Sequence, residues 1–196
     1  WGGGWGGGGG GGVGRGGAWA GGVGGGGGTV VGAVRGVGVC EAVGGDGGGE
    51  SMAMAMDATD AASVAAGFAA IGQRYGKLDG AFNNLGSSMG AARVHEIPDD
   101  QWHASLAVNL TAPFLLMKAE IPLLIAAGGG VIINNSSTAG ERGTHSLADY
   151  SAAKWGRIGL GQYAALEDGA EGMRSTTVAR GSIRTATKRE VGSPMA

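Results

Sequence analysis

The chain has 196 residues, of which 43% are hydrophobic and 15% charged, and a formal net charge of −2 at pH 7. This length fits one domain with a sizeable core, and the charge balance offers no basic face for nucleic acid. The single cysteine, Cys40, excludes an internal disulfide and any multi-cysteine metal site, so we expect a reducing, cytoplasmic setting. No apolar run approaches the roughly 20 residues that a membrane span needs, and the N-terminus lacks a signal pattern. We therefore expect a soluble protein.

Glycine is concentrated in the first part of the chain, because residues 1–50 hold 28 of the 46 glycines. Each glycine costs about 1 kcal/mol in a helix relative to alanine and has no side chain to bury, so this segment should not fold alone. It is either a low-complexity tail or half of a domain whose side chains were not identified when the letters were assigned. We favour the second interpretation, because apolar and functional-looking residues recur at the intervals of a strand–helix–strand unit.

The first predicted elements are two strands and a helix. The segment TVVGAVR at 29–35 resembles a strand, and SMAMAM at 51–56 alternates with the period of a strand. A helix follows, with an N-terminal cap at Thr59 or Asp60 and an end near Gly76.

Strands and helices continue to alternate through the rest of the chain. LDGAFNN at 78–84 predicts a short strand, and residues 98–127 carry the apolar pattern of a long helix, which Pro113 should bend. Further strands are predicted at 131–137 and 174–181, with a helix at 149–168 between them. This order predicts an α/β fold: a doubly wound parallel sheet with helices on both faces, in three layers.

Ligands of such sheets bind at the carboxyl ends of the strands. The polar or small residues at or just after the predicted strand ends are Asp57, Asn83, Ser137 and Gly181. We therefore expect the functional side chains to gather at this edge.

The segment ADYSAAKWG at 148–156 places a tyrosine and a lysine four positions apart. Residues at this spacing share one face of a helix, so Tyr150 and Lys154 can point the same way with only small side chains between them. A phenol beside an ammonium suits proton transfer. The pattern alone also fits an exposed surface pair, because such matches are common by chance.

Five motifs in order carry a resemblance to a known family: NNLG at 83–86, VNLTAPF at 108–114, NNSSTAG at 134–140, YSAAK at 150–154 and VARGSIRT at 178–185. Over residues 51–185 the chain resembles the classical short-chain dehydrogenase/reductase family. The resemblance implies a Rossmann-like fold, with residues 1–196 as a single dinucleotide-binding domain, although family members usually extend beyond such a C-terminus. It also implies an NAD(P)-dependent oxidoreductase that transfers hydride between a nicotinamide and a secondary alcohol or ketone.

The same resemblance implies four catalytic residues. Tyr150 would be the general acid/base, while Lys154 would favour its phenolate form and hold the cofactor's ribose. Ser137 would hydrogen-bond the substrate oxygen; Ser136 is the alternative, one position short of the family's spacing to the tyrosine. Asn109 would hold a water that relays protons to solvent, although alone it reads as a structural polar residue in a helix.

The family's glycine-rich phosphate turn can be aligned with residues 7–15, which places Gly8, Gly12 and Gly14 as its glycines and Val13 among them. Gly7 stands where the family has threonine. Arg35, after the strand at 29–35, favours NADP, because a basic residue there can meet the extra phosphate and NAD enzymes usually carry an acidic one. NAD remains possible, since Arg35 also reads as an exposed loop residue.

The resemblance implies further cofactor contacts along the chain. Asp57 would meet the adenine, Asn83 the ribose region of the adenosine, and Gly86 would allow close approach. Gly181, Ile183 and Thr185 would form the loop behind the nicotinamide, Ile183 at the carboxamide and Thr185 toward the diphosphate. Arg180 departs from the family, which has proline there, and this puts the shape of the loop in question.

The remaining polar loop residues are open to two interpretations. Glu141, His145, Ser88 and Met89 lie where the family shapes its substrate pocket, and they read equally well as plain loop residues. The histidines His95, His103 and His145 do not cluster at a metal-ligand spacing, so we expect no metal.

Two other expectations concern partners and activity. The resemblance suggests a homotetramer packed through helices 99–127 and 149–168, where the small residues Ala112, Ala153, Gly156 and Gly159 would permit close approach. Apolar helix faces in a sheet protein are, however, more often simply core. The alternatives to an enzyme are a catalytically silent nucleotide-binding sensor or scaffold, and a truncated fold with a disordered interaction tail. We expect no nucleic acid or membrane partner.

Overall fold

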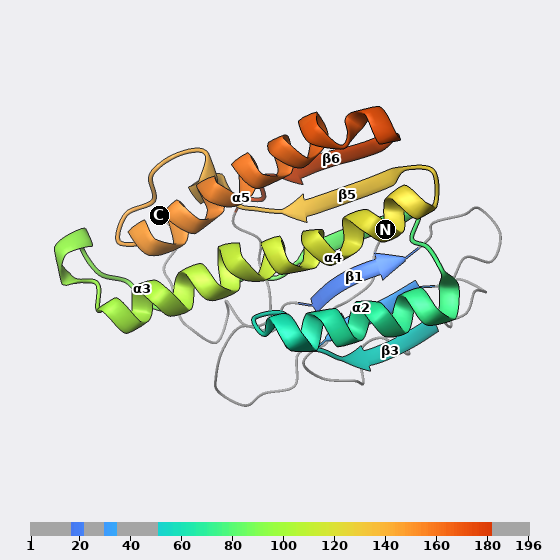
Figure 1. Cartoon of the computed structure of the whole chain (residues 1–196). Coiled ribbons are helices and arrows are strands. Elements are labelled where there is room, and N and C mark those ends of the chain that lie inside the picture. Colours follow the sequence, from blue (N-terminus) through green and yellow to red (C-terminus); the bar gives the residue numbers. More distant parts are fainter. Residues whose placement is uncertain (1–16, 22–29, 35–50, 182–196) are drawn as a thin grey trace.

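The computed structural model describes residues 17–21, 30–34 and 51–181, which adopt a Rossmann-like α/β fold (Figure 1). Six strands form one sheet in the order β3-β2-β1-β4-β5-β6. Their bounds are Gly17–Gly21 (β1), Val30–Val34 (β2), Ser51–Ala55 (β3), Gly80–Asn84 (β4), Gly130–Asn135 (β5) and Met173–Val178 (β6). The α-helices are Ala61–Tyr75 (α2), Asp99–Leu106 (α3), Ala112–Ala126 (α4) and Ala148–Glu167 (α5). A π-helical segment, Ala107–Thr111 (η3), joins α3 to α4, and 3-10 turns lie at Val94–Glu96, Thr138–Gly140 and Gly169–Glu171.

One strand departs from the predicted parallel sheet. Strands β2 to β6 run in one direction, whereas β1 is antiparallel to both of its neighbours, β2 and β4. Residues 22–29 join β1 to β2, and this connection is too short for a parallel crossover, which needs about a dozen residues or more. The prediction of a parallel sheet is therefore wrong for β1. Its first residue, Gly17, pairs with Asn84, near the carboxyl ends of the other strands.

The described helices α2, α4 and α5 lie along one face of the sheet (Figure 1). Asn134 of β5 bonds to the sulfur of Met117 on α4 and also lies against Gly161 of α5, so both helices cover the same side of this strand. Phe82 of β4 points to the other side and is 37% exposed. Among the described residues no helix covers that second face. The prediction of helices on both faces of the sheet therefore concerns, for this face, residues outside the described ranges.

The hydrophobic core lies between the sheet and these helices. Phe68 and Ile71 enter it from α2, Leu116 and Leu124 from α4, and Ile132 from β5. The last three are fully buried. Burying each such side chain stabilises the fold by about 1.5–3 kcal/mol, and this packing holds β4, β5 and α4 together.

Helix α2 begins and ends where its sequence predicts. The Asp60 carboxylate accepts hydrogen bonds from the backbone N–H groups of Ala62 and Ser63, which confirms Asp60 rather than Thr59 as the cap. Gly76 ends the helix with a φ of 74°, a conformation that glycine adopts without the penalty of a Cβ atom.

The long helix predicted at 98–127 is divided into α3, η3 and α4. Pro113 has no backbone N–H, so an α-helical bond to the carbonyl of Asn109 cannot form. The chain makes a wider turn here, in which the Ala112 N–H donates to the Ala107 carbonyl. The effect predicted for Pro113 thus takes the form of a π-helical segment, and that segment carries Asn109.

The segment Asp99–Ala126 is long and apolar enough to cross a membrane by length and composition alone. The expectation that no such run exists is therefore wrong. The apolar composition has a local cause, because Leu116, Met117 and Leu124 are buried in the core. A core helix passes the same test, so this feature carries no argument for a membrane.

Candidate active site

Four predicted site residues lie at the edge where the parallel strands end. Asp57 comes after β3, Gly86 after β4, Ser137 after β5 and Gly181 after β6. The Asp57 carboxylate accepts hydrogen bonds from the backbone N–H and the hydroxyl of Thr59, at 2.9 and 2.6 Å. These bonds fix the turn that leads from β3 into α2, beside the edge where a ligand would bind.

Tyr150 and Lys154 lie in the first turns of α5 and share one of its faces. The Lys154 ammonium is 5.3 Å from the centre of the Tyr150 ring. Lys154 is only 2% exposed, whereas the tyrosine is half-buried. The burial of the lysine rules out the interpretation of this pair as two exposed surface residues.

The surroundings of Lys154 weaken its hold on a proton. Its Nζ donates to the Leu85 carbonyl at 3.4 Å. Burial disfavours the charged form, and the positive charges of Arg157 and Arg180 act in the same direction, so the pKa of Lys154 falls from 10.5 to about 7. At a pKa of about 7, both protonation states of the amine are populated near neutral pH.

Asn109 joins the π-helical segment to the loop after β4. Its fully buried side chain donates to the Ser87 carbonyl at 2.8 Å and accepts from the Ser87 N–H at 3.1 Å. Gly86, which directly precedes Ser87, has a φ of 144°. A Cβ atom at this position would lie 2.6 Å from Lys154 Nζ and 2.7 Å from Asn109 Oδ1. Glycine at this position therefore lets the loop pass between Asn109 and Lys154.

The two serines after β5 have different surroundings. Ser136 is buried, and its hydroxyl donates to the Lys154 carbonyl at 3.1 Å. Ser137 is half-buried, and its hydroxyl accepts from the Ala139 N–H at 3.2 Å. The Ser136 hydroxyl anchors α5 to the sheet, so Ser137 is the serine that remains able to meet a substrate.

Asn83 lies away from the edge where cofactor contacts were expected. Its side chain is fully buried on the helix side of β4 and donates to Glu120 at 3.0 Å and to Asn134 at 3.2 Å. An enclosed amide with both N–H groups engaged by protein oxygens cannot contact a nucleotide. The side chain of Asn83 therefore does not support the predicted place of this residue at the ribose of the adenosine, because the alternation of the strand turns it toward the core.

Sequence reasoning did not select Glu120 and Arg157, which are both fully buried beside this network. Burial is the main effect on the carboxyl and raises the pKa of Glu120 to about 7, against the lowering effects of Asn83 and Arg157. Burial also lowers the pKa of Arg157 to about 10, while Tyr150 and Glu120 oppose that change. Two features of the sequence could have pointed to these residues. Glu120 is a lone carboxylate in an apolar helix, and Arg157 lies three positions after Lys154, on the same helical face.

The two loops predicted to shape a substrate pocket meet each other. Ala92, in the segment after β4, forms a parallel bridge with Leu147, and its N–H donates to the Ser146 carbonyl at 3.1 Å. Ser146 has a φ of 60°, a left-handed conformation that is costly for a residue with a Cβ atom. Glu141 and His145 are exposed in the second loop, as Ser88 is in the first, while Met89 is half-buried.

The loop after β6 is attached to the loop after β5. The Arg180 carbonyl accepts from the Thr138 N–H at 3.1 Å, so the pairing of the two strands continues past their ends. Arg180 and Gly181 are exposed. The other predicted cofactor residues lie outside the described residues: Gly8, Gly12, Val13, Gly14, Arg35, Ile183 and Thr185. In the described part of the chain, no group of three or more His, Cys, Asp or Glu residues could hold a metal ion.

The chain matches known proteins over most of its length. The family model for short chain dehydrogenase matches residues 8–196. The chain is 38% identical to trans-4-hydroxycyclohexanecarboxylate dehydrogenase of Sinomonas cyclohexanicum over 130 residues, which are 66% of this chain and 49% of that protein. It is also 38% identical to cyclohexanol dehydrogenase of an Acinetobacter species over 111 residues, which are 57% of this chain and 44% of that protein. The chain thus spans about half the length of the curated relatives it matches.

Solved structures with the same fold include proteins bound to either nicotinamide cofactor. NAD+-bound xylitol dehydrogenase has a TM-score of 0.71 at 28% identity, and the match covers 74% of this chain and 57% of that one. ElxO with NADP bound has a TM-score of 0.69 at 27% identity, covering 71% of this chain and 56% of that one. With the motifs at the strand ends, these matches establish that the chain belongs to the classical short-chain dehydrogenase/reductase family.

Proposed function

We propose that this protein is an NAD(P)-dependent oxidoreductase that transfers hydride between a nicotinamide cofactor and a secondary alcohol or ketone. The observation that carries the proposal is the pairing of the half-buried Tyr150 with a lysine whose pKa is lowered to about 7 by burial and nearby cations. A proton must move whenever a hydride converts a carbonyl to an alcohol. A tyrosine beside a readily titrating amine can supply it at neutral pH.

Each catalytic residue has a separate role in this proposal. In reduction, Tyr150 gives its phenolic proton to the substrate oxygen, and in oxidation it takes the proton back. Lys154 stabilises the phenolate by its charge when protonated, and Ser137 donates a hydrogen bond that orients the substrate oxygen. Asn109 maintains the π-helical segment and the loop after β4, which keeps the lysine's surroundings in place.

The residues present fit a dinucleotide cofactor. A lysine ammonium has three N–H donors, and among the described residues the Leu85 carbonyl is its one hydrogen-bond acceptor. The remaining donors suit the hydroxyl groups of a ribose, and Gly86 offers backbone without a side chain beside them. When bound, the nicotinamide supplies the hydride donor or acceptor. We propose NADP as the cofactor on the basis of Arg35, with NAD as the alternative.

The names of the relatives suggest the first substrates to test. Both curated relatives described above act, by name, on a secondary alcohol of a six-membered ring. In both substrates the reacting group is a hydroxyl on an apolar ring, which suits a site where Ser137 and Tyr150 contact that oxygen. We therefore propose cyclic ketones and the corresponding alcohols as the substrate class.

The test compares the wild type with Tyr150→Phe, which keeps the ring and removes the proton donor. NADPH or NADH oxidation is followed by absorbance with cyclohexanone and substituted cyclohexanones, and cofactor binding by fluorescence titration. We expect turnover to fall by at least about a hundredfold in Tyr150→Phe, with cofactor affinity changed by less than a few fold. The matched control is Tyr163→Phe, because Tyr163 is on the same helix and 65% exposed.

Three outcomes would contradict the proposal in different ways. Full turnover in Tyr150→Phe would refute the assigned mechanism. Cofactor binding by the wild type without turnover of any tested carbonyl would instead favour a silent nucleotide-binding sensor or scaffold. Binding of neither cofactor would indicate that the glycine-rich half does not form a nucleotide site.

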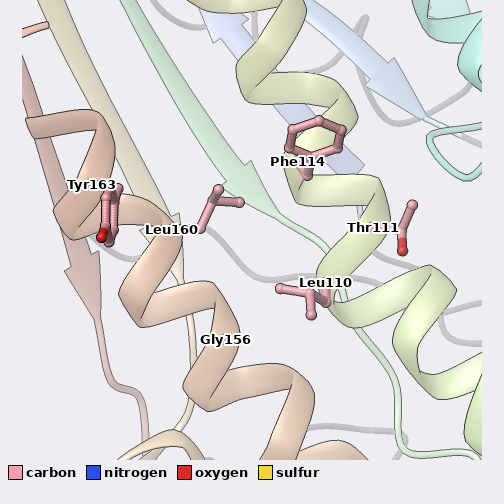
Figure 2. Close-up of a pocket in the computed structure, with 6 residues that line it drawn as sticks. All are labelled: Leu110, Thr111, Phe114, Gly156, Leu160 and Tyr163. Atoms are coloured by element: carbon pink, nitrogen blue, oxygen red, sulfur yellow. The ribbon is translucent and has the colours of Figure 1, made fainter. Parts of the chain in front are cut away.

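We further propose that the protein assembles as a homotetramer through α4 and α5. An open groove of about 440 Å³ runs between these helices (Figure 2), and it is lined by Leu110, Thr111, Phe114, Gly156, Leu160 and Tyr163. It does not include Tyr150 or Lys154, so it is not the reaction site. Phe114 is 45% exposed, which is costly for an aromatic ring left in water. Light scattering after size exclusion would give the mass, and Phe114→Glu should reduce it; an unchanged tetramer would place the interface elsewhere.

A further inference from the structure

The backbone at the end of β4 and just after it is held by three side chains from two helical segments. Arg157 and Lys154 reach it from α5, and Asn109 reaches it from η3. Together they bond to residues 83, 85 and 87, which alternate along this stretch. The stretch contains Gly86, whose backbone passes directly beside the Lys154 ammonium.

Arg157 makes two of these attachments. Its guanidinium donates through Nη1 to the Leu85 carbonyl at 2.8 Å and through Nη2 to the Asn83 carbonyl at 2.5 Å. The Leu85 carbonyl also accepts from Lys154, at 3.4 Å. The rigid, planar fork of the guanidinium can bind two carbonyl oxygens at once, which an ammonium cannot do with the same geometry. Arg157 therefore sets the position of the carbonyl to which Lys154 is bound.

We propose that Arg157 is a positioning residue for the oxidoreductase reaction: it fixes the backbone of residues 83–86 against α5 and places a second buried positive charge beside Lys154. This inference rests on the proposed function in one respect, because it takes Lys154 to be the residue that holds the cofactor. Arg157 itself is fully buried, and its hydrogen bonds go to the backbone carbonyls of Leu85 and Asn83, so it acts on Tyr150 and Lys154 through its charge and through this backbone.

The charges around Lys154 come from several elements. Tyr150 and Arg157 are on α5, Arg180 follows β6, and Glu120 faces Arg157 from α4. Of the two positive charges that lower the pKa of Lys154, Arg157 has the larger effect and Arg180 the smaller. Glu120 compensates part of the charge of Arg157 without lying within ion-pair distance, and the two are linked through Asn83. Removing Arg157 alone would leave Glu120 without its compensating charge, so the test must change both.

The experiment compares three variants of the full chain, and a fourth serves only to assign the NMR signal. Arg157→Met with Glu120→Gln removes both charges, Arg157→Lys keeps the positive charge but not the fork, and Arg174→Met is the control at an exposed arginine on β6. The first readout is the titration of Lys154, followed by NMR of 13C-labelled lysine and assigned with Lys154→Arg. The second is the dissociation constant for NADPH and NADH, measured by fluorescence.

We expect the two readouts to separate charge from geometry. Loss of both charges should raise the midpoint of the Lys154 titration by about one to two pH units, whereas Arg157→Lys should leave it near the wild-type value. Both variants should weaken cofactor binding by about fivefold or more, because the loop beside Lys154 is no longer fixed. The control should change neither quantity. A merely structural role would lower the melting temperature without this division between the two variants.

Two results would overturn the inference. One is an unchanged Lys154 titration in the double variant with native circular dichroism. The other is an unchanged cofactor dissociation constant in Arg157→Lys, and this second result decides the question if the double variant does not fold. Failure of the proposed function is seen separately, as a wild-type protein that binds neither cofactor. The NMR titration still tests the electrostatic part of the inference in that case.

Discussion

The raised pKa of the buried Glu120 carboxyl leads to a prediction of how the stability of the protein depends on pH. Its pKa is 4.5 in the unfolded chain and about 7 in the folded protein, because burial disfavours the charged form. Between these values the folded state binds more protons than the unfolded state, so stability falls as pH rises from 4.5 to 7. The full change corresponds to about 3 kcal/mol at 1.36 kcal/mol per pKa unit. Below pH 4.5 both states are protonated, and the carboxyl carries no burial penalty.

Glu120→Gln removes this titration while keeping the size and one acceptor oxygen of the side chain. The free energy of unfolding would be measured by urea titration with tryptophan fluorescence, from pH 4.5 to pH 7.5. We expect the difference between wild type and variant to shift by about 3 kcal/mol across this range, in favour of the variant at high pH. Lys154 is charged in both proteins over most of this range and cancels. Glu171→Gln, at an exposed position on a 3-10 turn, is the control. A difference that stays constant within about 1 kcal/mol would refute the reasoning.

Three further substitutions test the site and the core. Gly86→Ala would place a Cβ atom 2.6 Å from the Lys154 ammonium, at a residue with a φ of 144°. We therefore expect kcat/KM, measured by cofactor oxidation, to fall by on the order of a hundredfold. A near-normal kcat/KM would mean that the loop does not lie against the lysine. Ser137→Ala should lower kcat by on the order of a hundredfold with little loss of stability, whereas Ser136→Ala should keep most of kcat and cost about 1 kcal/mol in urea unfolding; the reverse pattern would exchange the two serines. Leu116→Ala should cost about 2–5 kcal/mol in the same assay, because the side chain is fully buried, and a loss below 1 kcal/mol would contradict its place in the core.

The parts of the fold that sequence predicted well are those with a clear local signal. Asp60 and Gly76 delimit α2 because a cap needs an acceptor side chain and a helix end favours glycine at positive φ. Tyr150 and Lys154 came together because a spacing of four residues fixes them on one helical face. These rules act within a few residues of the chain, so the sequence alone was sufficient.

The errors concern features that depend on distant parts of the chain. The direction of β1 could not be predicted, because its sequence GAWAG has no side-chain pattern that distinguishes parallel from antiparallel pairing. The family resemblance implies a cofactor contact for Asn83, but its side chain binds Glu120, which lies 37 residues away in the sequence. Arg157 was missed because an arginine in a helix usually indicates an exposed position.

The central place of β1 in the sheet has a consequence for how the protein folds. Strands β2 and β3 are joined to β4, β5 and β6 through β1 alone within the sheet. The pairing of β1 with β4 brings Gly17 beside Asn84, which requires closure of a long loop, whereas β5 and β6 and the helices near them pair over shorter separations. We therefore expect the β4–β6 unit with α4 and α5 to form early and β1 to insert late. A chain caught before that step exposes an unpaired edge along β4, the kind of surface from which misfolded assemblies grow.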